Sequence, residues 1–166
     1  MTMHPRTLVV ITMLAAAQPA CSKDPDTDDV ERDQSESLEG TDEDENGVRD
    51  DIDAYIESAA PDSERTRAAM RQVAKTLQDL MLAQHDKEAA VEAAIRMNRG
   101  IECLLGLEAK RGYEMLSELE ARSFNTKQRA RAYAKANGHL GGEYFRGTPR
   151  SKRLNSCAFD VEALKD

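Results

Sequence analysis

The feature that most constrains the fold is an apolar stripe with helical spacing in the middle of the chain. Its members are Met70, Val73, Ala74, Leu77, Leu80 and Met81. Residues that recur every three or four positions lie on one face of an α-helix, and Asp62 or Ser63 can cap a helix that runs to about residue 84. Because aromatic residues make up only 4% of the sequence, the core must be aliphatic, and we predict an all-α fold.

Three further helices are predicted after this one. Asp86 can cap a helix over residues 87–107, a third helix covers about 109–122, and Asn125 can cap a fourth over about 126–137. The residues expected to form their apolar faces are Val91, Ala94, Ile95, Ile101, Leu104, Leu105, Tyr113, Leu116, Leu119, Ala130, Tyr133, Ala134 and Asn137. Since no strand alternation is present, a small antiparallel helical bundle is the simplest architecture.

An acidic twelve-residue segment carries the main chemical signal. Residues 42–53 are Asp-Glu-Asp-Glu-Asn-Gly-Val-Arg-Asp-Asp-Ile-Asp, the pattern of a calcium-binding loop. The oxygen ligands at positions 1, 3, 5, 7, 9 and 12 would be Asp42, Asp44, Asn46, the Val48 carbonyl, Asp50 and Asp53. Gly47, at position 6, permits the sharp turn around the ion. The alternative is an acidic turn that matches by chance, because residues 22–60 hold 16 Asp and Glu.

This segment resembles the loops of EF-hands, dockerins and thrombospondin type 3 repeats. It differs from a paired EF-hand because Asp53 replaces the longer Glu at position 12 and Arg49 stands where paired loops place an apolar residue. The resemblance implies a lone loop and an affinity for Ca²⁺ on the order of 10⁻⁴–10⁻³ M. A helix is expected to follow the loop, with an apolar face of Ile52, Tyr55, Ile56 and Ala59.

A wider resemblance covers residues 46–160. The loop, the Tyr55-Ile56 pair that follows it, the later sequence Asn125-Thr126-x-x-Arg129 and the late Cys157 are similar to those of a group of uncharacterised exported proteobacterial proteins. The resemblance implies export and a calcium loop, but it implies no activity.

The N-terminal segment also predicts export. Residues 1–20 have the pattern of a signal peptide, with an apolar run too short to cross a bilayer. Ala20-Cys21 resembles the end of a bacterial lipobox, so Cys21 is a candidate for lipidation, whereas Ala15-Ala16-Ala17 fits ordinary secretion. We therefore expect an outer-membrane lipoprotein that faces the periplasm, with a soluble periplasmic or secreted protein as the alternative.

Charge divides the rest of the chain into regions. Residues 22–60 carry 16 acidic and 3 basic groups within a chain of net charge −8. We expect a disordered acidic tether over residues 21–41, the loop and its exiting helix over 42–60, and a helical domain over 61–166. The acidic arm gives no support for nucleic-acid binding, and the rest of the chain lacks the interleaved aromatic residues of a single-strand binder.

Two cysteines remain after Cys21. In an oxidising compartment, Cys103 and Cys157 are expected to form a disulfide. Two buried free thiols are the alternative, and a redox-active pair is disfavoured because no Cys-x-x-Cys is present.

Few other residues suggest chemistry. His139 and Glu143 could ligate zinc, but two ligands are too few, and we expect them in a surface turn within an otherwise irregular C-terminal region. The basic residues Arg146, Arg150, Lys152 and Arg153 fit a solvated tail, or a contact with acidic lipid or with the tether. We predict a non-enzymatic structural or binding module with an unknown protein partner. The alternatives are a small envelope enzyme with a site near His139 and Glu143, or a periplasmic calcium buffer.

Overall fold

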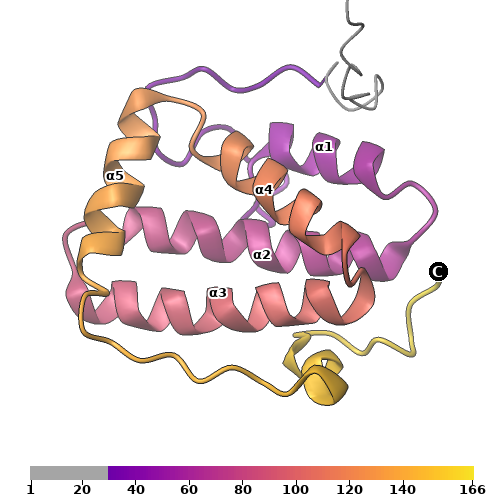
Figure 1. The fold of residues 1–166 in the computed structure, drawn as a ribbon. Coiled ribbons are helices and arrows are strands. Elements are labelled where there is room, and N and C mark those ends of the chain that lie inside the picture. Colours follow the sequence, from indigo (N-terminus) through magenta and orange to yellow (C-terminus); the bar gives the residue numbers. More distant parts are fainter. Residues whose placement is uncertain (1–29) are drawn as a thin grey trace, which may run out of the picture.

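The computed structural model describes residues 30–166, which form the predicted all-α fold (Figure 1). The elements are α1 (Asp50–Ala59), α2 (Glu64–Leu82), α3 (Lys87–Leu107), α4 (Arg111–Ser123), α5 (Lys127–Gly138) and the 3-10 helix η1 (Arg150–Ser156). The predicted signal peptide and Cys21 lie outside the described residues. Within residues 30–166, none of the helices combines the length and the apolar character needed to cross a bilayer.

The central element is α2, which contacts each of the other α-helices. It runs side by side with α3, and a short turn connects the two (Figure 1). Both N-termini are capped as the sequence predicted: Ser63 Oγ accepts a hydrogen bond from the Thr66 N–H at 3.2 Å, and Asp86 Oδ1 accepts one from the Ala89 N–H at 3.1 Å. Such caps satisfy backbone donors that have no partner within the helix, which fixes where each helix begins.

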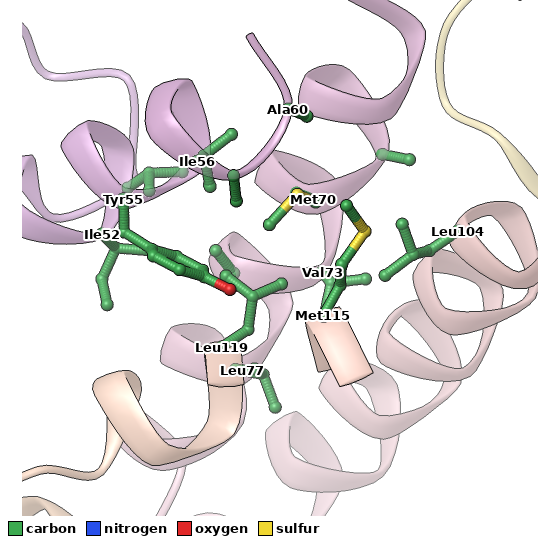
Figure 2. Packing of buried hydrophobic residues seen from close by; sticks show 14 of the residues in the cluster. Ile52, Tyr55, Ile56, Ala60, Met70, Val73, Leu77, Leu104, Met115 and Leu119 are labelled. Carbon is green, nitrogen blue, oxygen red and sulfur yellow. The ribbon is translucent and has the colours of Figure 1, made fainter. Parts of the chain in front are cut away.

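The main core lies between α1, α2, α3 and α4 (Figure 2). The predicted apolar face of α1 is buried, and so is the predicted apolar stripe on α2. These faces meet Cys103 and Leu104 of α3 and Met115 and Leu119 of α4. A smaller cluster, which includes Leu80 and Ala136, joins α2 and α3 to α5.

The apolar faces predicted for the later helices are partly wrong. The residues that are exposed instead are Ile95, Tyr113, Ala130, Ala134 and Asn137. In α5 the buried face is Arg129, Ala132 and Ala136. Alternating alanines give this helix two similar stripes, and the buried one contains an arginine that a hydrophobicity pattern assigns to solvent. The N-cap of α5 is Thr126 rather than Asn125, because the Thr126 hydroxyl accepts a hydrogen bond from the Arg129 N–H at 3.2 Å.

Residues 30–41 lie on the helical body, although we expected them to belong to a flexible tether. The buried Arg129 side chain donates hydrogen bonds to the Asp33 carbonyl at 2.7 Å and to the Ser37 carbonyl at 3.1 Å. Asn125 Nδ2 donates to the same Asp33 carbonyl at 2.8 Å. The Asn-Thr-x-x-Arg sequence therefore both starts α5 and holds this polar segment, which needs few apolar side chains to stay in place.

Asp33 is a second link between this segment and α5. Burial by itself would raise the pKa of its carboxyl, but hydrogen bonds from Ser35 and Thr41 and the charge of Arg129 lower that pKa to about 2. Asp33 Oδ2 lies 3.4 Å from Arg129 Nη2. The carboxylate is thus charged at neutral pH and paired with a buried guanidinium.

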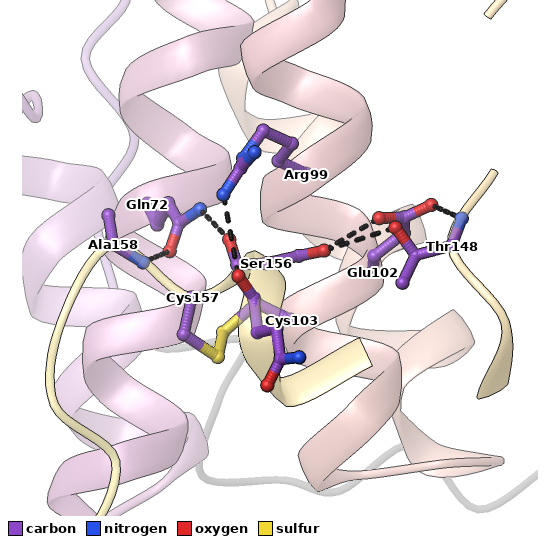
Figure 3. The surroundings of a disulfide bond; sticks show 9 residues. Gln72, Arg99, Glu102, Cys103, Thr148, Ser156, Cys157 and Ala158 are labelled. Atoms are coloured by element: carbon purple, nitrogen blue, oxygen red, sulfur yellow. Dashed lines mark hydrogen bonds between the residues drawn. A yellow bond between two sulfur atoms is a disulfide. The ribbon is translucent and has the colours of Figure 1, made fainter. Parts of the chain in front are cut away.

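The C-terminal region returns along α3 and is joined to it by the predicted disulfide between Cys103 and Cys157 (Figure 3). It is not wholly irregular, since η1 covers residues 150–156. The buried Glu102 of α3 accepts hydrogen bonds from the Ser156 hydroxyl at 2.7 Å and from the Thr148 N–H (Figure 3). Burial alone would raise the pKa of Glu102, but these hydrogen bonds and the nearby Arg153 charge lower it.

Candidate metal centre

Three of the predicted ligands lie together in the acidic loop. Asp42, Asp44 and Asp50 each place one carboxylate oxygen so that the three atoms lie within 4.8 Å of one another. Asp50 is also the first residue of α1. The loop thus runs directly into the expected exiting helix, and the carboxylates at positions 9 and 12 belong to its first turn.

Asn46 links this group to Asp53. Its Nδ2 donates to Asp44 Oδ2 at 2.8 Å and to Asp53 Oδ2 at 2.9 Å. The carboxylates at positions 3 and 12 therefore converge on a single polar group. The Asn46 Oδ1 accepts from the Val48 N–H at 2.7 Å, so the side-chain amide would have to turn for its oxygen to ligate an ion.

Hydrogen bonds from backbone N–H groups hold the loop in its curved form. Asp42 accepts from the N–H groups of Asn46 at 3.1 Å and Gly47 at 2.9 Å. Gly47 has φ +82°, in the left-handed region that glycine adopts without strain. The Asp50 N–H closes the base of the loop on the Thr41 carbonyl at 2.9 Å. The turn predicted for position 6 is therefore present.

The loop is anchored to the body by the two residues that follow the glycine. The Val48 side chain is buried in the main core. Arg49 is also buried and pairs with both carboxylate oxygens of Asp51, while its Nη2 donates to the Arg122 carbonyl at 2.9 Å. Since this carbonyl lies in the last turn of α4, the arginine acts as a cationic C-terminal cap. Position 8 thus docks the loop on a helix, where a paired EF-hand would dock a second loop.

Asp53 has a partner that the sequence did not indicate. Arg71 of α2 donates from Nε to Asp53 Oδ1 at 2.6 Å and also pairs with Glu57. Burial would lower the pKa of this guanidinium, but the hydrogen bonds and charges of the two carboxylates raise it. The last ligand position is therefore tied to α2, with one carboxylate oxygen left facing Asn46.

The electrostatics of the centre favour a cation. The pKa of Asp44 is lowered, chiefly by the hydrogen bond from the Asn46 N–H, so this exposed carboxylate is charged at neutral pH. Residues 42–53 contain seven acidic groups and only Arg49 as a base. Because like charges this close repel one another, a bound cation would relieve the repulsion. Clustered carboxylate oxygens are the donor set preferred by hard cations such as Ca²⁺.

The other candidate residues lie elsewhere and have separate partners. His139 Nε2 is 3.2 Å from the Gln84 carbonyl, and Glu143 pairs with Lys87 Nζ at 3.0 Å. Among the basic C-terminal residues, Arg146, Arg150 and Lys152 are exposed. Comparisons of the chain with protein families, with curated proteins and with solved structures give no match.

Proposed function

We propose that this chain is a calcium-binding, non-enzymatic binding module of the cell envelope. The observation that carries the proposal is the convergence of Asp42, Asp44 and Asp50, with Asp53 directed toward the same region by Asn46. The Val48 carbonyl is the expected sixth protein ligand, by analogy with the loops that this segment resembles. Ca²⁺ suits the site better than Mg²⁺, which demands near-ideal octahedral geometry and keeps several waters.

The bound ion would serve a structural purpose. The loop joins residues 30–41 to α1, while Arg49 connects it to α4 and Arg71 connects it to α2. An ion that holds the aspartates together would fix residues 30–41, α1, α2 and α4 relative to one another. The affinity expected for such a lone loop, on the order of 10⁻⁴–10⁻³ M, is that of extracellular modules rather than of cytosolic sensors.

Calcium titration of the purified protein by calorimetry and thermal melting tests this proposal. We expect one equivalent to bind. Calcium at ten times the dissociation constant should add about 1.4 kcal/mol of stability, which corresponds to a rise of about 4 °C in Tm for a protein of this size. Absence of both heat and stabilisation at such calcium concentrations would reduce the loop to an acidic turn.

Matched variants separate a specific site from a general charge effect. Asp42→Ala/Asp44→Ala should abolish both the binding heat and the rise in Tm. The control is Asp62→Ala/Glu162→Ala, which removes the same charge at two exposed positions outside the loop. If the control lost calcium binding to the same extent, the effect would come from net charge and not from the predicted ligands.

The envelope location and the lipid anchor are part of the same proposal. They are supported by the N-terminal sequence and by the Cys103–Cys157 disulfide, which is typical of proteins in oxidising compartments. Expression in a Gram-negative host with labelled palmitate should give a labelled, membrane-bound protein, and Cys21→Ser should lose the label. An unlabelled wild-type protein in the soluble periplasmic fraction would favour ordinary secretion instead.

A further inference from the structure

A groove lies beside the candidate metal centre, where the loop, α2, α3 and the C-terminal segment meet. It has a volume of about 490 Å³ and extends from Asn46 of the loop, along α2 and α3, to Phe159. Its apolar side chains come from Val48, Ala68, Ala158 and Phe159. At the far end, Gln72 holds the C-terminal segment through hydrogen bonds with the Ser156 carbonyl and the Ala158 N–H (Figure 3).

The charged residues of this groove are mostly basic. Arg71, Lys75, Arg96 and Arg99 line it, with Asp79 as the single acidic residue. The negative net charge of the chain comes from residues 22–60, whereas residues 61–166, which supply most of the lining of the groove, hold more basic than acidic groups. A positively charged cleft raises the local concentration of anions.

The partners of these cations differ. Arg71 pairs with Asp53 and Glu57, and Arg96 pairs with Asp79 at 3.5 Å and with Glu92 at 3.8 Å, so carboxylates balance both charges. Arg99 Nη2 donates to the Asn155 carbonyl at 3.4 Å, which is a long hydrogen bond (Figure 3). Lys75 has no hydrogen-bonding or ion-pair partner among residues 30–166. Its Nζ lies directly over Gly47 of the loop, 2.0 Å from where a Cβ on that glycine would be. Lys75 is therefore an available cation at the end of the groove nearest the metal centre.

We propose that this groove binds one small anionic amphiphile, a fatty-acid-like molecule with a single acidic group and an apolar body. The volume lies within the range of small-molecule sites, roughly 300–1,000 Å³. Lys75, at the end of the groove nearest the loop, supplies the charge that fixes the acidic group, and Ala68 and Phe159 supply apolar surface for the body. Neither a cationic nor a strongly polar ligand would satisfy both features.

A calcium effect on this site follows if the proposed function is correct, and this part of the inference rests on it. Calcium would neutralise the aspartates of the loop, over whose Gly47 the Lys75 ammonium lies, and would compete for Asp53, which Arg71 now holds. Both changes make positive charge available to the groove. We therefore expect calcium to strengthen anion binding about fivefold, and the anion to strengthen calcium binding by the same factor, because such coupling is reciprocal.

Binding can be measured with the fluorescent probe anilinonaphthalene sulfonate, which has one acidic group on an apolar body. Titration of the purified protein should give one site. Laurate should displace the probe, whereas dodecyltrimethylammonium, which has the same chain length and the opposite charge, should not. Measurements at two protein concentrations show whether a second copy covers the groove instead, because the apparent probe affinity would then fall at the higher concentration and overturn the proposal.

Two variants test the position of the site. Lys75→Glu should weaken probe binding at least tenfold, while Lys127→Glu, an equal charge change in the first turn of α5, should leave it unchanged. Ala68→Phe fills the groove without a change of charge and should also weaken binding. Circular dichroism checks that each variant keeps its helical content. Equal binding by the wild type and Lys75→Glu would overturn the proposal.

The outcomes distinguish the groove from the loop. Probe binding that depends on Lys75, in a protein that takes up no calcium, would retain the groove and reject the proposed calcium function. Calcium uptake without any probe binding would retain the proposed calcium function and reject the groove as a binding site. If both ligands bind and neither changes the affinity of the other, the site is retained and the coupling is rejected.

Discussion

Replacement of Arg129 by methionine should release residues 30–41 from the helical body. The guanidinium of Arg129 is completely buried and donates to the Asp33 carbonyl at 2.7 Å, to Asn125 Oδ1 at 2.9 Å and to the Ser37 carbonyl at 3.1 Å. Methionine fills a similar volume but donates no hydrogen bond. The change would leave the Asp33 carboxylate without its cation and the Ser37 carbonyl without its donor.

The expected loss of unfolding free energy is about 3 kcal/mol. Removal of one partner of a buried ion pair destabilises by about 3–5 kcal/mol, because the remaining charge stays desolvated. The lower end applies here, since residues 30–41 can detach and return Asp33 to water. The loss is therefore limited to the free energy that docks this segment.

Urea unfolding followed by circular dichroism gives the change in stability, and hydrogen exchange with mass spectrometry locates it. In Arg129→Met, the amides of residues 30–41 should exchange faster than in the wild type. The amides of α2 and α3 should lose less of their protection against exchange than those of residues 30–41. Arg131→Met is the matched control, because Arg131 is exposed on the same helix, and surface changes of this kind alter stability by only about 0.5 kcal/mol. Unchanged stability together with unchanged exchange in residues 30–41 would refute the assigned role of Arg129.

Three further predictions concern single features of the structure. Gly40 has φ +71°, and a Cβ there would lie 2.2 Å from the buried Arg49 side chain. Gly40→Ala should therefore destabilise the protein by about 2 kcal/mol in thermal melting. The control is Gly138→Ala, whose added methyl group meets no atom within 4 Å and should not destabilise the protein. The double variant Cys103→Ser/Cys157→Ser should lose about 4 kcal/mol in urea unfolding, since the disulfide closes a long loop, and a loss below about 1 kcal/mol would contradict that role. The pKa of Asp33 falls from 3.8 to about 2 on folding. The Asp33 carboxylate therefore contributes about 2 kcal/mol to the free energy of unfolding above pH 4, and this contribution is lost as the pH falls through about 2. This part of the acid dependence of unfolding should be missing in Asp33→Asn, and an identical pH profile in both proteins would contradict it.

The sequence predicted best those features that depend on neighbouring residues. The bounds of α3 and the Ser63 and Asp86 caps follow from local spacing and capping chemistry. The buried faces of α1 and α2 follow in the same way, because both helices carry one clear apolar stripe. The disulfide was predictable because only two cysteines remained to form it.

Two of the features that the sequence did not predict depend on polar contacts between distant residues. Residues 30–41 have few apolar groups, a composition that normally indicates a disordered segment. They are held by hydrogen bonds to Arg129 and Asn125, which lie more than 90 positions away. The same arginine misled the assignment of the buried face of α5, since hydrophobic periodicity places a charged residue in solvent. One buried cation thus accounts for both errors.

The candidate metal centre combines both kinds of information. The spacing of Asp42, Asp44 and Asp50 was sufficient to place their carboxylates together, because the loop closes on itself over a few residues. Asp53 differs because its environment depends on Arg71, which belongs to another helix. In an EF-hand the glutamate at position 12 reaches the ion with two oxygens, whereas here the shorter aspartate gives one oxygen to the arginine. If the loop binds calcium as proposed, α2 would therefore help to determine its affinity, and Arg71 would be the link by which the ion influences the groove beside it.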